Sequence, residues 1–129
     1  MGWIGVDLDG TLAIYDGWIG EDHIGAPVPK MVERVKHWLS KGVEVRIFTA
    51  RVTEIEGRDI TNIKTAITNW CIEHIGQALP VTNVKDFKMI ELWDDRAVRV
   101  IANTGEPVLG PGFSEKKAQE RLIRGNTNN

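Results

Sequence analysis

The stretch WIGVDLDGT, residues 3–11, decides the fold of this chain. Its apolar first half predicts a short buried strand, and Gly10 predicts a tight turn directly after that strand. Because side chains alternate along a strand, Asp7 and Asp9 lie on the same side and near each other. Ligands of open α/β sheets bind beyond the carboxyl ends of the strands, so these two carboxylates are candidates for a ligand site.

Strand and helix patterns alternate along the rest of the chain. Apolar residues at three- and four-residue spacing predict one helix opened by Pro27 and Pro29 and a second one over 60–75, each closed by a glycine. Further strands are predicted at 43–49, 81–85, 89–93 and 97–101. This order favours right-handed βαβ units, so we expect an α/β, three-layer Rossmann-like fold with a mostly parallel sheet between helices.

The length of 129 residues fits one compact domain, and the composition, 42% hydrophobic and 26% charged, is ordinary for a globular protein. We expect a catalytic core over residues 1–112. Residues 113–129 are expected to form a C-terminal helix, over 114–124, and a flexible tail.

Composition also argues against several functional classes. A formal net charge of −2 does not favour broad, sequence-independent nucleic-acid binding. Cys71 is the single cysteine, so no intramolecular disulfide can form, and a reducing cytoplasm is the expected location. No apolar run approaches the ~20 residues that span a bilayer, so no membrane association is expected.

Polar side chains follow the other predicted strands where each one ends. Thr49 ends the second strand, Lys85 the third, and Asp94 and Asp95 follow the fourth. Carboxylates that converge on Asp7 without compensation would repel one another, whereas Mg²⁺ prefers oxygen ligands and removes the repulsion. A hydroxyl and an ammonium group can then hold phosphoryl oxygens and offset charge in a transition state.

At these residues the sequence resembles the haloacid dehalogenase (HAD)-like hydrolase superfamily. Its four motifs occur in the expected order: DxDGT at 7–11, a strand ending in Thr49, a lysine, and an apolar strand ending in Asp94-Asp95. The lysine is assigned to Lys85, with Lys88 as the alternative. The resemblance covers residues 3 to about 101, and the first and fourth motifs together are its specific part.

The resemblance implies a Mg²⁺-dependent phosphohydrolase with Asp7 as the nucleophile that takes up the phosphoryl group. Asp9 would protonate the leaving group and then activate water. The phosphoryl group would be bound by Thr49, Lys85 and the turn at Gly10. The metal ligands would be Asp7, the backbone carbonyl of Asp9, Asp94, and Asp95 directly or through water.

The spacing of the motifs implies a capless member of this family. The gap at 12–26 is a short loop, and the later gap is filled by the long helix. The triplets Thr-Ala-Arg at 49–51 and Asp-Asp-Arg at 94–96 are similar to those of polynucleotide 3′-phosphatase domains. A nucleotide or nucleic-acid end phosphate is therefore the favoured substrate, with Arg51 and Trp18 as substrate-binding residues, and a neighbouring subunit of a homo-oligomer as one way to cover the site.

Two alternatives have a different function. A response-regulator receiver domain also combines an α/β fold with Asp, Thr and Lys around Mg²⁺, but it carries its acidic pair after the first strand and a lone nucleophile in mid-chain. Here the DxDGT motif comes first and the acidic pair last. The other alternative, a catalytically idle HAD-like binding module, does not account for the intact motif residues.

Overall fold

A computed structural model describes residues 2–108 of the chain. These residues belong to two compact units, which are described separately: one contains residues 2–16 and 20–95, the other residues 17–19 and 96–108. The predicted C-terminal helix and tail at 113–129, and the predicted boundary before them, lie outside the described residues.

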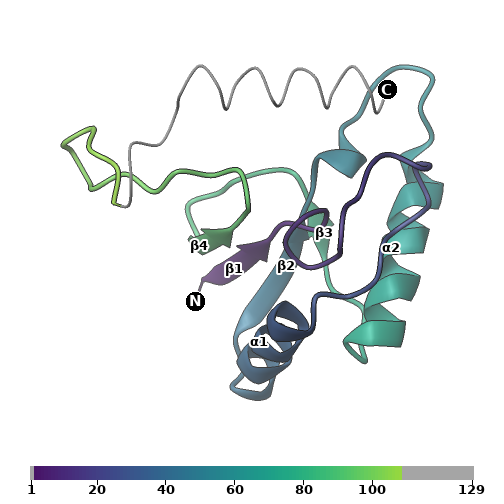
Figure 1. The fold of residues 1–129 in the computed structure, drawn as a ribbon, viewed down its shortest axis with the longest axis horizontal. Helices are drawn as coiled ribbons and strands as arrows, with labels where there is room; N and C mark the ends of the chain where they lie inside the picture. The colour runs from purple at the N-terminus through teal and green to yellow at the C-terminus, as the bar shows by residue number, and fades with distance from the viewer. Residues whose placement is uncertain (1, 109–129) are drawn as a thin grey trace. The chain divides into compact units, whose positions relative to one another are not determined.

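The larger unit is built on a four-stranded parallel sheet. Its strands are β1 (Trp3–Val6), β2 (Glu44–Phe48), β3 (Val81–Thr82) and β4 (Met89–Trp93), in the order β3-β2-β1-β4 (Figure 1). The predicted α/β class with a parallel sheet is thus confirmed. Because β1 lies between β2 and β4, the acidic stretch that follows β1 lies between the ends of its two neighbours.

Two predicted strands differ from the structure. The third strand ends at Thr82 and not at Lys85, so residues 83–88 form a connecting loop. Residues 97–101 form no strand. In the smaller unit, Val100 makes only an isolated antiparallel bridge with Pro107. The chain turns back between them, through Asn103 and Gly105 at positive φ, so that this segment forms one arm of a short hairpin.

The helices begin and end close to where the sequence predicts. Helix α1 spans Pro29–Ser40, with proline in its first turn, and ends just before Gly42 at φ 80°. Helix α2 spans Ile60–His74, and the side chain of its N-cap residue Asp59 accepts a hydrogen bond from the Thr61 backbone N–H. A short 3₁₀ turn, η1 (Ala50–Val52), follows β2.

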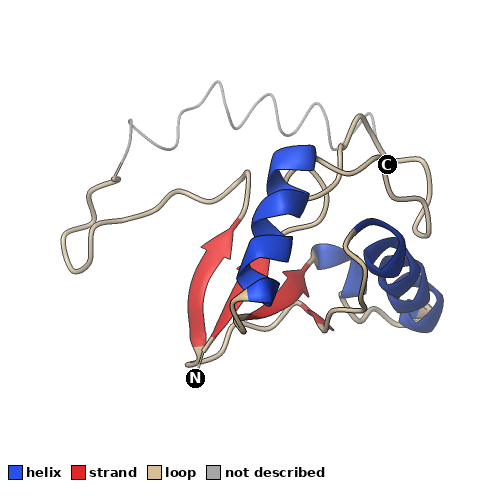
Figure 2. Ribbon diagram, turned by 90° about the horizontal axis from the view of Figure 1, so that it is seen from below, coloured by secondary structure: helices blue, strands red, loops and turns tan. Residues whose placement is uncertain are grey.

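Both helices pack on the same face of the sheet. Figure 2 shows the backbones of these helices and of the strands. Alternate strand residues, Ile4 and Val6 in β1 and Val45 and Ile47 in β2, share one hydrophobic core with buried residues of α1 and α2. The topology requires this, because β1, β2 and β3 follow one another in one direction and right-handed crossovers then place their helices on one side. The larger unit therefore forms two layers, and the predicted third layer stays a prediction.

The opposite face of the sheet is covered partly by a charged side chain. The Arg46 guanidinium lies 4.4 Å from the centre of the Trp3 ring, and the Trp3 indole N–H donates to Asp86 Oδ1 at 2.8 Å. Trp3 is only 1% exposed although it lies outside the main core. The arginine stem and the cation–π contact thus shield an aromatic residue that no described helix covers.

Among the helices of residues 2–108, none is long and apolar enough to cross a membrane.

The packing of α2 can be tested with two isoleucines on opposite sides of the helix. Ile67 is fully buried and Ile72 is 52% exposed. We expect Ile67→Ala to lower the free energy of unfolding by about 2–5 kcal/mol, since it leaves a cavity in the shared core. The control, Ile72→Ala, is expected to change it by less than about 1 kcal/mol. Urea unfolding followed by circular dichroism measures both, and equal effects would contradict the assigned face.

Candidate functional site

A tight turn after β1 gives the site its shape. The Asp7 backbone N–H donates to the Trp93 carbonyl at 2.9 Å, which extends the pairing of β1 with β4 by one residue. The Ala13 N–H then donates back to the Leu8 carbonyl at 2.8 Å, and the Gly10 N–H donates to the Ala13 carbonyl at the same distance. These bonds hold residues 7–13 in a compact loop at the carboxyl edge of the sheet.

Gly10 is required in this loop for two reasons. Its φ of 88° lies in the left-handed region that favours glycine. In addition, an ideal Cβ at this position would lie 2.6 Å from Asp95 Oδ2, so any side chain would displace that carboxylate. The backbone at Gly10 therefore approaches the acidic residues more closely than any other residue type allows.

Three carboxylates converge at this edge. Asp7 follows β1, and Asp94 and Asp95 follow the neighbouring strand β4. One oxygen of each carboxylate lies within 4.8 Å of an oxygen of the other two. The cluster contains three of the four predicted metal-binding residues; the side chain of the fourth, Asp9, is not part of it.

Thr11 ties the acidic pair to the loop, a role that the sequence reasoning missed. Its hydroxyl oxygen accepts the Asp95 backbone N–H at 3.1 Å and lies 3.3 Å from Asp95 Oδ1 and 3.5 Å from Asp7 Oδ2. The single hydroxyl proton can be donated to either carboxylate. The position of Thr11 as the last residue of the DxDGT motif was the sequence feature that could have indicated this role.

Burial and like charges raise the pKa of Asp7 from its ordinary value of 3.8 to about 8. Desolvation is the largest cause, followed by the negative charge of Asp94, a hydrogen bond and the charge of Asp95, and then the charge of Asp9. Protein groups alone therefore keep Asp7 protonated at neutral pH. A hard divalent cation such as Mg²⁺ fits this all-oxygen donor set, because it would remove the repulsion that raises the pKa.

Asp9 is held by a buried arginine. The Arg51 Nε and Nη2 groups donate to the two carboxylate oxygens of Asp9 at 2.7 and 2.8 Å, which is a bidentate ion pair. Arg51 Nη1 donates to the Glu21 carbonyl at 2.8 Å and lies 3.4 Å from the Gly20 carbonyl. The structure thus joins a predicted acid–base residue to a predicted substrate-binding residue and fixes both to the loop.

Thr49 lies at the carboxyl end of β2, on the same edge of the sheet. It is 2% exposed, and its hydroxyl oxygen accepts the Arg51 backbone N–H at 3.2 Å as the N-cap of η1. A hydroxyl that accepts one bond can still donate its proton to another acceptor. Thr49 therefore positions Arg51 and keeps the capacity to bind a phosphoryl oxygen.

The lysines lie apart from these interactions. Lys85 and Lys88 are both exposed in the loop 83–88, and within residues 2–108 no ion pair joins either of them to a carboxylate. The Lys88 carbonyl accepts the Trp3 backbone N–H at 2.9 Å, which is a structural role. The choice between these two lysines for a phosphate-binding role stays a prediction.

The loop after residue 13 is anchored at several points. The Ile14 N–H donates to the Ala26 carbonyl at 2.8 Å, and the Trp70 indole N–H donates to the Gly25 carbonyl at 2.9 Å. Arg58 pairs with Glu21 at 3.0 Å. Trp18, a predicted substrate-binding residue, belongs to the smaller unit and is 40% exposed there.

Comparisons with known proteins support the fold assignment and no other property. No family model matches the sequence, and no curated protein sequence matches it. Among solved structures, the chain is similar to a conserved protein coded by a locus of Bacteroides thetaiotaomicron, with a TM-score of 0.53 and 20% identity over 95% of this chain and 89% of that one. At this identity the similarity supports the α/β architecture and says nothing about activity.

The raised pKa of Asp7 predicts a pH-dependent stability in metal-free buffer. Because the folded value of about 8 lies above the ordinary 3.8, the folded protein keeps a proton in this window that the unfolded chain has lost. The contribution of Asp7 to stability is therefore expected to fall as pH rises from about 4 to 8. Melting temperatures of the protein and of Asp7→Asn should diverge across this window, whereas the control Glu54→Gln, on an exposed loop, should track the parent. Parallel curves for Asp7→Asn and the parent would contradict the shift.

The Arg51–Asp9 pair predicts a large loss of stability when only one partner is removed. The two side chains are 6% and 21% exposed, so Arg51→Met would leave a carboxylate partly buried without its partner. We expect a loss of about 3 kcal/mol in urea unfolding, partly recovered by adding Asp9→Asn. The matched control is Arg58→Met, whose partner Glu21 is 51% exposed, with an expected loss of roughly 1 kcal/mol or less. Additive single losses in the double variant would show that the pair is not coupled.

Proposed function

We propose that this protein is a Mg²⁺-dependent phosphomonoesterase that acts through an aspartyl-phosphate on Asp7. The observation that carries the proposal is the convergence of Asp7, Asp94 and Asp95 within 4.8 Å at the carboxyl edge of a parallel sheet. The order of the motifs, with DxDGT first and the acidic pair last, is that of the HAD-like hydrolases and not of receiver domains. We also propose that the fold is a three-layer HAD-like core without a cap domain.

The first step is attack on phosphorus by a carboxylate oxygen of Asp7. A bond forms between this oxygen and phosphorus, and the bond from phosphorus to the leaving-group oxygen breaks. Asp7, the Asp9 carbonyl, Asp94 and Asp95 would hold the metal. When bound, Mg²⁺ supplies positive charge that keeps Asp7 ionised and offsets the charge on the phosphoryl oxygens. The Thr49 hydroxyl and Lys85 bind the phosphoryl oxygens in this scheme.

Asp9 moves the protons. It donates one to the leaving-group oxygen in the first step and accepts one from the water that attacks the aspartyl-phosphate in the second step. Each of its oxygens accepts one bond from Arg51 in the structure, so the proton that Asp9 donates would occupy a lone pair outside the fork, or Asp9 would leave the fork. A phosphoryl oxygen of the substrate is a competing acceptor for Arg51, and this exchange would release Asp9 when substrate binds.

The substrate class that the sequence motifs suggest is the terminal phosphate of a nucleotide or of a nucleic-acid strand. Its support is the sequence around Thr49-Ala50-Arg51 and the pair of Arg51 with Asp9, which places a guanidinium beside the proposed acid. The alternatives are a receiver-like signalling domain and an idle binding module. Neither would show metal-dependent turnover.

The proposal predicts Mg²⁺-dependent hydrolysis of a generic aryl phosphate. Asp7→Asn is expected to abolish turnover with the fold intact by circular dichroism, because it removes the nucleophile. Asp9→Asn is expected to slow turnover about 10²–10⁴-fold and to let phosphate accumulate on Asp7, detectable by mass spectrometry. The exposed loop variant Glu54→Gln is the matched control. Retained turnover in Asp7→Asn would contradict the assignment of Asp7 as the nucleophile. Mg²⁺ binding without turnover would favour the idle binding module.

A further inference from the structure

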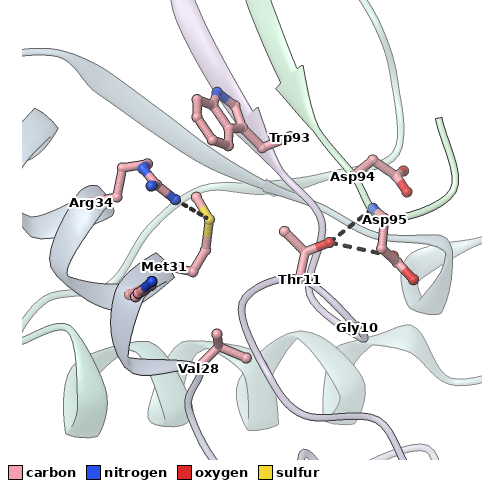
Figure 3. Close-up of a pocket in the computed structure, with 9 residues that line it drawn as sticks. Gly10, Thr11, Val28, Met31, Arg34, Trp93, Asp94 and Asp95 are labelled. Carbon is pink, nitrogen blue, oxygen red and sulfur yellow. Dashed lines mark hydrogen bonds between the residues drawn. The ribbon is translucent and has the colours of Figure 1, made fainter. Parts of the chain in front are cut away.

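An open cavity of about 280 Å³ lies beside the acidic cluster and carries charges of both signs. Figure 3 shows Arg34 and Met31 of α1 on one side of it and Asp94 and Asp95 on the other. Thr11 and Trp93 line the cavity between these sides, and Lys30 lines it as well. A molecule that reaches from one side to the other would meet carboxylates at one end and cations at the other.

The two cations have no carboxylate to neutralise them. Within residues 2–108, no Asp or Glu oxygen lies within ion-pair distance of Lys30 or Arg34. The Arg34 guanidinium instead lies 4.9 Å from the centre of the Trp93 ring, and its Nη1 lies 3.7 Å from the Met31 sulfur. These contacts orient the guanidinium at the cavity and leave its charge uncompensated.

The stability of α1 does not explain this arrangement. Lys30 and Arg34 lie four residues apart, where like charges on a helix repel each other. Lys30 is also in the first turn, where a cation opposes the helix dipole, and this turn contains no acidic residue. Two residues whose charges destabilise the helix thus also line the cavity. Such a loss of local helix stability is expected where residues have a binding role.

We propose that Lys30 and Arg34 form a subsite for a second anionic group of the substrate, across the cavity from Asp94 and Asp95. This inference rests on the proposed phosphatase function, since it takes the reacting phosphoryl group to lie at the Asp7–Asp94–Asp95 cluster. The substrate class is then a small phosphomonoester whose leaving group carries a carboxylate or a second phosphate. The apolar surfaces of Met31 and Trp93 between the two ends suit a short carbon frame.

The size and charge of the site favour a small molecule over a polymer. The cavity holds a fragment of a few carbon atoms plus an anionic group, and the net charge of −2 does not favour sequence-independent binding of a nucleic-acid strand. The exposed carboxylates of Asp16 and Asp22, on the loop after β1, would further repel a polyanion. A nucleic-acid end is therefore the competing outcome of the test.

The test compares phenyl phosphate with 4-carboxyphenyl phosphate in the full-length protein. The two esters have leaving groups of similar acidity and differ in one negative charge. We expect kcat/KM to be at least about tenfold higher for the carboxylated ester, as charge-assisted hydrogen bonds imply. Lys30→Ala with Arg34→Ala should remove this preference, with a fall in kcat/KM at least about tenfold larger for the carboxylated ester than for phenyl phosphate. Lys36→Ala with Lys41→Ala, which neutralises two exposed lysines outside the cavity, is the matched control.

The outcomes separate this inference from the proposed function. No preference in the parent, or equal loss on both esters in the double variant, would overturn the subsite. A stronger preference for a 3′-phosphorylated oligonucleotide than for the carboxylated ester would overturn the small-molecule class. If neither ester is hydrolysed, the proposed function fails, and calorimetric titration with the same two esters still tests the subsite. A Kd ratio that depends on Lys30 and Arg34 supports it, and equal Kd values overturn it.

Discussion

The parallel pairing of β1 with β4 forces three carboxylates into one small volume, and the rest of the site is arranged around this repulsion. The bond from the Asp7 N–H to the Trp93 carbonyl holds the two strand ends together, so Asp94 and Asp95 cannot move away from Asp7 without breaking the sheet. Thr11 and the close approach of Gly10 restrain Asp95 further. The raised pKa of Asp7 is the electrostatic cost of this arrangement.

The sequence was a reliable guide where a single local rule decides the structure. Alternation in the first strand, proline and glycine at the ends of α1, and strands alternating with helices predicted a mostly parallel sheet. The interior position of β1 is known only from the structure. The grouping of Asp7, Asp94 and Asp95 followed from the same reasoning, because parallel strands end at one edge. The Asp9 side chain, predicted as the acid–base group, is bound by Arg51 in the structure, and the metal-binding role predicted for the Asp9 backbone carbonyl stays a prediction.

The remaining differences depend on partners distant in sequence. The strand predicted at 97–101 has β-branched residues, but a hairpin turn within the smaller unit takes up its hydrogen bonds. The β-strand propensity of individual residues is a weak predictor where such tertiary hydrogen bonds decide the conformation. The ion pair between Arg51 and Asp9 joins residues 42 positions apart, and no spacing rule reveals it. The arginine of a Thr-Ala-Arg triplet after a strand was the one local hint, and it indicated a residue facing a ligand.

The hydrogen bonds of Arg51 set how this part of the protein can accommodate a guest. Within residues 2–108, its guanidinium donates two of them to Asp9 and one to Glu21, and lies 3.4 Å from the Gly20 carbonyl. The edge formed by Nε and Nη2 can hold one bidentate partner, so an acceptor that binds there must replace Asp9. The affinity of that edge for a guest is thus the difference between its bonds to the guest and its bonds to Asp9, and weak acceptors are rejected without any steric barrier.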